Sequence, residues 1–271
     1  MAKRMVAAAL ALALVGCDAI DEVEVDQTRR EANVATHTLI GDSAPEAALI
    51  LVVPAANLAG YLPDGYQLVV LPGAADGADG ALLWVFSGFQ QNITTDGDPA
   101  GSNHLVHVAV QIQEPPPPPG QTITPGASHL YEIRLIFDNH QTASWGHAKA
   151  GEPTAYSNDM TYAQQDPGLG NGFISMDVGG AVGGFSFFAE YGPLAPLPPP
   201  QAYSWHEGDH GLSFGQAVFA DLLGAGAGGA LCADPGTWMG NILGAPCRGG
   251  GGLALTSHTT LTWTVYFPED D

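Results

Sequence analysis

Basic side chains are scarce in this sequence. Lys and Arg account for 7 of its 271 residues, against 28 Asp and Glu, and the formal net charge is −21. Proteins that bind nucleic acids neutralise phosphates with Lys and Arg, so this composition excludes nucleic acid as a partner. Adhesion to anionic lipid head groups needs the same side chains and is not expected either.

The chain also lacks an apolar run long enough to span a bilayer, which takes about 20 residues. Its longest early run, Met5 to Val15, is shorter and follows Lys3 and Arg4. A basic start before a short apolar stretch is typical of a secretory signal peptide. The stretch ends in Leu14-Val15-Gly16-Cys17, which resembles the lipobox of bacterial lipoproteins.

The lipobox resemblance implies that residues 1–16 are a signal peptide and that Cys17 carries lipid. The protein is then exported and anchored to a membrane through Cys17, facing the periplasm or the cell surface. The alternative is an ordinary secretory signal with a chance cysteine. We expect residues 17–44 to form an acidic tether and residues 45–271 to form a single β-rich domain.

Cysteine is rare as well, because only Cys232 and Cys247 follow Cys17. An exported chain meets an oxidising compartment, where an even pair most simply forms a disulfide. This bond would close a loop of about 15 residues and stabilise the fold by about 3 kcal/mol. Its predicted role is structural.

Helical periodicity is sparse, whereas alternating and short apolar segments are frequent. One helix is expected over residues 55–61 and another over 215–223. Turn residues punctuate the segments between, which favours a closed or nearly closed antiparallel sheet in a mainly β (α+β) chain. The predicted strands cover residues 66–71, 82–86, 104–113, 129–137, 172–178, 183–191 and 259–267.

Three short motifs follow one another at fixed intervals: Asp138-Asn139, Gly146-His147 and Gly151-Glu152-Pro153. Their spacing resembles that of the acetoacetate decarboxylase family, and residues 53–63 are similar to the family's opening helix, which ends in Leu-Pro. The resemblance covers residues 53–191. It implies an antiparallel β-barrel or cone with a few short helices around a buried cavity.

The family's chemistry requires a lysine that forms a Schiff base with a β-keto acid, beside a second cation that lowers its pKa. Those two positions hold Thr154 and Ala155, and neither can form an imine. Lys149 is the one lysine after the signal peptide, and a lone lysine is more often a solvated charge than a nucleophile. We therefore expect a non-catalytic, cofactor-free barrel that binds a small apolar or carboxylated ligand.

The predicted ligand-binding side chains include His147, which stands at the family's arginine position. Period-2 alternation over residues 129–137 places Arg134 on the same strand face as Glu132. Arg134 would bind a carboxylate on the ligand, or pair with Glu132 instead. The candidate ligand-binding residues are Arg134, Trp145, His147, Thr154 and Tyr156.

His206-Glu207-Gly208-Asp209-His210 spells the H-E-x-x-H pattern of zinc hydrolases. That chemistry needs a helix, which brings both imidazoles to one face with the glutamate as general base. The glycines at 208 and 211 disfavour a helix, so we interpret the pattern as a chance match in a loop. A metal-assisted hydrolase or lyase using His206, Glu207 and His210 is the first alternative function. A ligand-free surface structural protein is the second.

Two Asp-Gly pairs, Asp76-Gly77 and Asp96-Gly97, resemble fragments of calcium-binding loops. Neither continues into the run of oxygen ligands that ends in Glu in an EF-hand. Asp-Gly is also a frequent hairpin turn, and we predict turns at both positions.

Overall fold

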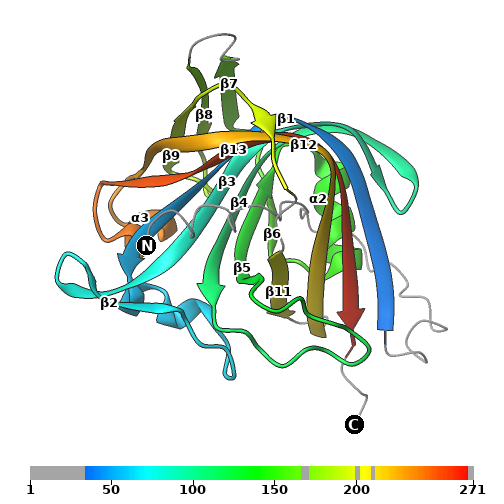
Figure 1. The fold of residues 1–271 in the computed structure, drawn as a ribbon, viewed down its shortest axis with the longest axis horizontal. Helices are drawn as coiled ribbons and strands as arrows, with labels where there is room; N and C mark the ends of the chain where they lie inside the picture. Colours follow the sequence, from blue (N-terminus) through cyan, green and yellow to red (C-terminus); the bar gives the residue numbers. More distant parts are fainter. Residues whose placement is uncertain (1–33, 166–170, 199–201, 209–210, 268–271) are drawn as a thin grey trace.

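A computed structural model describes residues 34–165, 171–198, 202–208 and 211–267. The predicted signal peptide, Cys17 and His210 lie outside these residues. All the strands of the described part belong to one large sheet (Figure 1). None of the helices found there has the length and hydropathy of a membrane span.

The chain is mainly β, as predicted, with five short helical segments. The helical segments are η3 (Ala55–Asn57), η4 (Ala59–Tyr61), α2 (His140–Trp145), η5 (Gly146–Ala150) and α3 (Trp238–Leu243). The strands are β1 (Val34–Pro54), β2 (Val70–Ala75), β3 (Ala78–Thr95), β4 (Asp98–Ile112), β5 (Ser128–Phe137), β6 (Thr154–Tyr156), β7 (Met160–Gln165), β8 (Gly172–Val178), β9 (Phe185–Tyr191), β10 (Ala195–Pro196), β11 (Ala202–Gly208), β12 (Gly211–Ala233) and β13 (Cys247–Tyr266).

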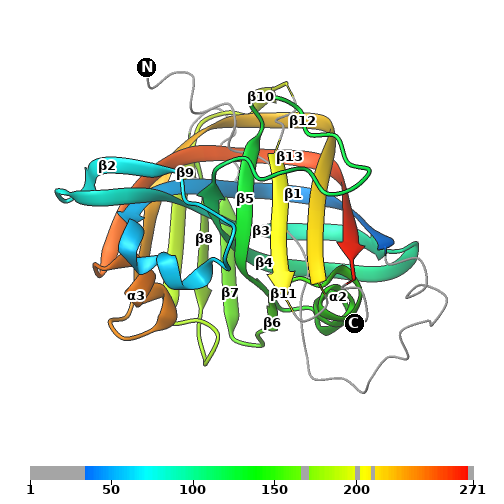
Figure 2. The ribbon, with the colours of Figure 1, turned by 90° about the horizontal axis from the view of Figure 1, so that it is seen from below.

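The strands pair in the order β11-β5-β4-β3-β1-β13-β12-β9-β8-β7. Because β11 also pairs with β12, the pairings from β11 to β12 form a circuit, and the sheet is strongly curved (Figure 2). The first strand meets the last, with Val34 opposite Tyr266. Strands β9, β8 and β7 extend the sheet beyond β12 (Figure 1).

Successive residues of the central strands alternate between two buried clusters. Leu83 and Val85 of β3 belong to one cluster, together with residues of β8, β9 and α3. Trp84 and Phe86 belong to the other, together with Ala143 of α2. We call the two sides of the sheet the β9 face and the α2 face after these elements.

The helices that cover the α2 face are set by local capping. Asn139 precedes α2, and its side chain accepts a hydrogen bond from the backbone N–H of Thr142 at 3.1 Å, which satisfies a free donor of the first turn. The next turn, η5, ends at Gly151 with φ of 68°. Glycine takes this left-handed conformation without steric cost, so the chain can turn sharply into β6.

Several sequence predictions differ from the structure. The prediction of a helix over residues 215–223 is wrong, because these residues lie in β12, which pairs with β13. The helix expected over 55–61 is two short 3₁₀ turns. The acidic tether was expected to run to residue 44, but β1 already begins at Val34 and pairs with both β13 and β3. Pairing with distant strands outweighs weak local preference in these segments.

Both Asp-Gly pairs form two-residue hairpin turns, as predicted. Asp76 and Gly77 join β2 to β3 with φ of 54° and 92°. Asp96 and Gly97 join β3 to β4 with φ of 51° and 88°. Positive φ at both central residues is the requirement of a type I′ turn, which Asp-Gly meets readily.

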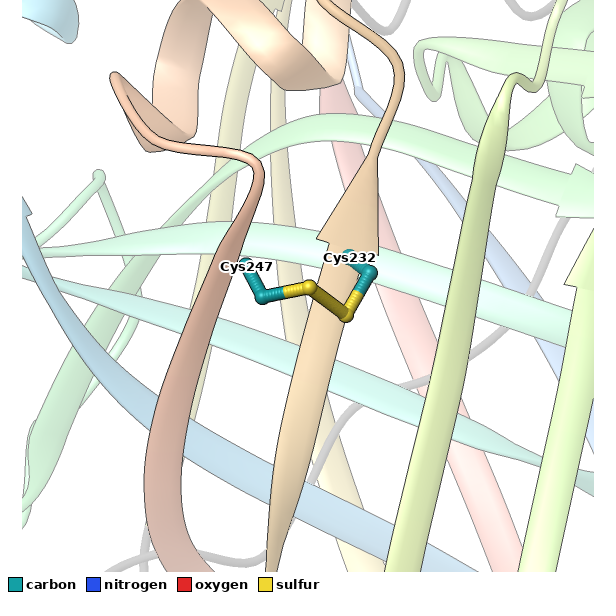
Figure 3. Close-up of a disulfide and its surroundings, with 2 residues drawn as sticks. All are labelled: Cys232 and Cys247. Atoms are coloured by element: carbon teal, nitrogen blue, oxygen red, sulfur yellow. A yellow bond between two sulfur atoms is a disulfide. The ribbon is translucent and has the colours of Figure 1, made fainter.

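The predicted disulfide is present between Cys232 of β12 and Cys247 of β13, with an S–S distance of 2.08 Å (Figure 3). The two residues are direct partners in the β12–β13 ladder. The chain between them carries α3, so the bond closes the base of the loop that holds this helix.

Candidate functional site: a buried polar face

An irregularity in β5 decides which side chains meet on the α2 face. Val108 of β4 pairs with Arg134, and the next residue, Ala109, pairs with Glu132, so Ile133 is an extra residue in β5. An extra residue inverts the alternation of a strand. Glu132 therefore lies on the α2 face and Arg134 on the β9 face. The prediction that they share one face is wrong for this reason.

Glu132 is the centre of a fully buried hydrogen-bonded group. Its Oε1 accepts a hydrogen bond from Ser204 Oγ at 2.5 Å, and its Oε2 contacts His107 Nε2. All three residues are at most 2% exposed. The carboxylate lies between the serine and the histidine, so His107 cannot take the serine proton as in a hydrolase triad. Ser204 and His107 instead hold the carboxylate of Glu132 in a fixed position.

Glu152, a second buried carboxyl group, follows Gly151 directly. Its Oε1 accepts a hydrogen bond from Ser213 Oγ at 2.8 Å, whereas Oε2 is buried without a hydrogen-bond partner. Burial raises the pKa of Glu152 well above its ordinary value, and the charge of Glu132 raises it further. The Ser213 bond and the nearby Trp263 indole oppose this rise more weakly. The two carboxyl groups are thus electrostatically coupled.

His206 of β11 also contacts Glu132. Its Nδ1 lies 3.3 Å from the backbone carbonyl oxygen of Glu132. Burial lowers the pKa of His206 to about 4, with a smaller contribution from His147, so the ring is neutral at physiological pH. Because His206 and Glu207 lie in a strand, the helix that a zinc hydrolase requires is not formed in residues 202–208. The part of the chain that the structure describes contains no group of three metal-binding side chains.

Glu46 brings a third carboxyl group to the α2 face. It lies where the register of β1 shifts, opposite Leu255 of the α2-face cluster. Gln90 Nε2 donates a hydrogen bond to Glu46 Oε1 at 2.9 Å, and burial raises the pKa of Glu46 to about 7. Gly88 makes room for it, because a Cβ at that position would lie 2.3 Å from Glu46 Cγ.

Buried polar atoms without a hydrogen-bond partner gather on the α2 face. An unpaired buried group costs about 1–3 kcal/mol, so native proteins keep few of them except where a ligand or ordered water completes the bonding. On the α2 face these atoms belong to Trp84, Gln90, Asn103, His107, Thr142, Glu152, Thr154 and Trp263, whereas those of Ser87 and His129 lie on the β9 face. The α2 face is therefore polar in a way that core packing does not explain.

Three of the five predicted ligand-binding residues lie on or beside this face. Trp145 contacts Trp263 edge to face, with ring centroids 5.9 Å apart, and its indole N–H donates to Asp96 at 2.8 Å. Thr154 begins β6 opposite Leu135 of the α2-face cluster. Tyr156 also packs against this cluster.

The other two predicted residues do not join the buried group. The Arg134 guanidinium sits 4.6 Å from the ring centroid of Trp238, on the β9 face. No ion pair joins it to Glu132 among the described residues. His147 is exposed in η5, although it lies close enough to His206 to lower the pKa of that residue. The five residues therefore do not form one site.

Sequence reasoning missed the three glutamates of the α2 face. Glu152 had a visible signal, since it occupies the position where the acetoacetate decarboxylase motif has an aromatic residue. Glu46 and Glu132 had none, because their positions depend on two register shifts that no local pattern marks.

A separate cavity of about 460 Å³ lies where β7, β8 and β9 meet the disulfide. Three aspartates line it, namely Asp159, Asp177 and Asp234. None of the buried unpartnered atoms described above lines this cavity. The α2 face is the stronger candidate for a binding site.

No protein-family model matches the sequence, and a search of curated proteins found no relative. Among solved structures, the enduracididine biosynthesis enzyme MppR with HEPES bound has a TM-score of 0.52 at 12% identity, covering 94% of each chain. MppR complexed with pyruvate has a TM-score of 0.50 at 12% identity, covering 86% of this chain and 88% of that one.

An acetoacetate decarboxylase-like enzyme from Sphingomonas wittichii RW1 matches with a TM-score of 0.49 at 12% identity, over 86% of this chain and 91% of that one. Likeness at such identities concerns the fold alone. The chain shares its fold with MppR, and the predicted mainly β fold class, with a large sheet and a few short helices, is confirmed.

Proposed function

We propose that this protein is exported, anchored through lipid on Cys17, and uses its acetoacetate decarboxylase-like fold to bind a small polar molecule without Schiff-base catalysis. The carrying observation is the α2 face, which holds two buried, hydrogen-bonded carboxyl groups and buried polar atoms without a partner, Thr154 Oγ1 among them. A ligand with hydrogen-bonding groups would satisfy these atoms.

The side chain at position 154 supports the absence of decarboxylation. A hydroxyl group forms no imine, and among the acidic and basic residues Asp, Glu, Lys and Arg the one nearest to it in the chain is Glu152, which is not a cation. A structure of MppR holds pyruvate. That a protein of this fold binds a small carbonyl compound supports small-molecule binding here as well.

The polarity of the site argues against a carboxylated ligand. Arg134, which was expected to bind the carboxylate, points to the β9 face and stacks on Trp238. Three glutamates lie on the α2 face instead, and a further carboxylate beside Glu132 would be disfavoured, as the raised pKa of Glu152 indicates. The proposed ligand is therefore polar but not anionic.

Native mass spectrometry tests ligand binding directly. A soluble form that begins at Asp18 retains every described residue and omits the lipidated cysteine. We expect a mass adduct in the native spectrum that is lost on denaturation. If no adduct is found, and a panel of neutral and charged metabolites leaves the melting temperature unchanged, the protein is a ligand-free structural protein.

The absence of catalysis has its own test. Incubation with acetoacetate and borohydride should leave Lys149 unmodified and release no carbon dioxide above the buffer rate. Peptide mapping is unambiguous, because Lys149 is the single lysine after residue 16. A reduced adduct on Lys149 would restore an enzymatic role.

Membrane anchoring is tested in cells with the full chain. We expect the wild-type protein in the membrane fraction and labelled by a fatty acid. The Cys17→Ser variant should lose the label and leave that fraction. Membrane retention of the variant without label would point to an uncleaved signal segment.

A further inference from the structure

The disulfide lies at the end of a row of side chains that crosses five strands. Thr161 of β7 is opposite Asp177 of β8, which is opposite Ser186 of β9. Ser186 is opposite Cys232 of β12, and Cys232 is opposite Cys247 of β13. Residues directly opposite each other in a ladder point to the same face of a sheet. These five side chains therefore share one face.

The cavity of about 460 Å³ opens over this row. The first four residues of the row are among the described residues that line it, and Cys247 is not. The disulfide crosses from β13 to β12 (Figure 3), so the extension of the S–S bond past Cys232 leads over Ser186 and into the cavity. The other end of the bond faces solvent, because Cys247 is exposed.

The direction of access matters because of how a thiolate cleaves a disulfide. The attacking sulfur bonds to one sulfur of the disulfide while the bond to the other sulfur breaks. The bond that forms and the bond that breaks lie nearly in line, so a thiolate in the cavity reaches Cys232 Sγ. The sulfur that leaves is Cys247 Sγ, and its exposed position lets water stabilise the thiolate.

The charges around the cavity select among thiols. Asp159, Asp177 and Asp234 line it, and the described residues of the lining include no Lys or Arg. Negative charge at these positions repels a thiol that carries a carboxylate and attracts one that carries an ammonium group. The cavity therefore favours amino thiols over anionic thiols.

We propose that Cys232 Sγ is a thiol–disulfide exchange site that reacts, through this cavity, with small thiols bearing a positive charge. In the first step the thiolate bonds to Cys232 Sγ, the bond to Cys247 Sγ breaks, and Cys247 leaves as a thiolate that takes a proton from water. A second thiolate then attacks the sulfur supplied by the first and releases Cys232 as a thiol. Two thiols are thus oxidised to a disulfide, and Cys232 and Cys247 are reduced.

Reduction kinetics of the full chain in detergent test this selectivity. The chain carries Cys17→Ser, which leaves Cys232 and Cys247 as its only cysteines. The probes are cysteamine, 2-mercaptoethanol and 3-mercaptopropionate, and each rate is divided by that of the same thiol with an uncharged small disulfide. We expect the corrected rate of cysteamine to exceed that of 3-mercaptopropionate about tenfold or more. Equal corrected rates, or resistance to all three thiols, would overturn the proposal.

Two single-cysteine variants of this chain test where the exchange occurs. Cys247→Ser leaves Cys232 in the cavity, and Cys232→Ser leaves Cys247 outside it. The probes are cystamine and 3,3′-dithiodipropionate, which are the disulfides of the two charged thiols. We expect Cys247→Ser to form its mixed disulfide about tenfold faster with cystamine, and Cys232→Ser to show a smaller preference. Equal preference in both would assign the effect to the overall charge of the protein and contradict the site.

Charge variants with the disulfide intact keep the test decisive if a single-cysteine variant fails to fold. Asp177→Asn removes one carboxylate from the row and should lower the ratio of the cysteamine rate to the 3-mercaptopropionate rate severalfold. Asp98→Asn is the control, because Asp98 is an exposed residue at the start of β4 that does not line the cavity. The control should leave the ratio unchanged. Equal effects of the two variants would contradict a role for the cavity.

Discussion

A carboxyl group removed from water holds its proton more tightly, and the α2 face contains two such groups. Burial is the largest cause of the raised pKa of both Glu46 and Glu152. The charge of Glu132 raises the pKa of Glu152 further, whereas the hydrogen bond from Gln90 lowers the pKa of Glu46. The same physical effect therefore keeps a proton on both side chains at a pH where a solvated glutamate has lost it.

Glu46 should make folding less favourable as pH rises. Between its ordinary pKa of 4.5 and about 7, the folded protein retains a proton that the unfolded chain has lost, so stability falls through this window. Glu46→Gln mimics the protonated form and should be more stable than the wild type by about 1–3 kcal/mol at pH 8. The wild type and Glu46→Gln should have similar free energies of unfolding near pH 4.5.

Urea unfolding at several pH values measures this difference. Glu190→Gln, at an exposed position of β9, is the matched control. If the difference in unfolding free energy between the wild type and Glu46→Gln does not grow with pH, Glu46 titrates normally.

Ser204 should contribute through Glu132. Ser204→Ala removes the donor at 2.5 Å and leaves a buried carboxylate under-bonded, which should cost about 1–3 kcal/mol of unfolding free energy. Ser186→Ala changes an exposed serine of β9 and should cost far less. Urea denaturation of the pair gives the comparison, and equal losses would mean that the Ser204 bond adds nothing.

At the scale of elements, the two faces of the sheet depend on features that local sequence does not display. Strand β8 was predicted with its observed bounds, because residues 172–178 alternate between buried and less buried positions. Strand β12 was partly mistaken for a helix over residues 215–223, since alanine, glutamine and leucine in this segment are good helix formers. It becomes a strand through pairing with β13, β11 and β9.

The candidate site also depends on features that local sequence does not display. Thr154 was found from a motif, and the motif placed it correctly next to a buried segment. Arg134 was assigned to the same site by strict alternation, and one extra residue at Ile133 turned it to the opposite face. A bulge is fixed by the partner strand, so its position could not be derived from β5 alone.

The disulfide should stabilise the base of the α3 loop. Replacing both Cys232 and Cys247 with Ser removes a cross-link over a sequence separation of 15 residues, with an expected loss of about 3 kcal/mol. The melting temperature of the double variant should match that of the wild type under strong reducing conditions. A wild type that melts identically with and without reductant would mean that the bond contributes nothing to stability.

At the scale of the whole molecule, charge opposes folding. With a net charge of −21, compacting the chain brings like charges together. Raising sodium chloride from 10 mM to 0.5 M should therefore raise the melting temperature, because added ions screen this repulsion.

Sodium sulfate at equal ionic strength distinguishes screening from salting out. Screening would raise the melting temperature by the same amount in both salts, whereas salting out would raise it more in sulfate. Exposed pairs such as His258 with Asp42 are weakened by salt, but such pairs contribute little. A falling melting temperature in sodium chloride would show that local ion pairs outweigh the net repulsion.

The pairing of β1 with β13 has a consequence for the order in which the molecule can form. Val34 meets Tyr266, so one neighbour of the first strand is missing until the last strand has been made. Contacts this distant in sequence form slowly, because the long intervening loop must close before the contacts stabilise the fold. The sheet therefore cannot complete its circuit until the residues of β13 have been synthesised, so closure of the sheet is one of the last events in the formation of this molecule.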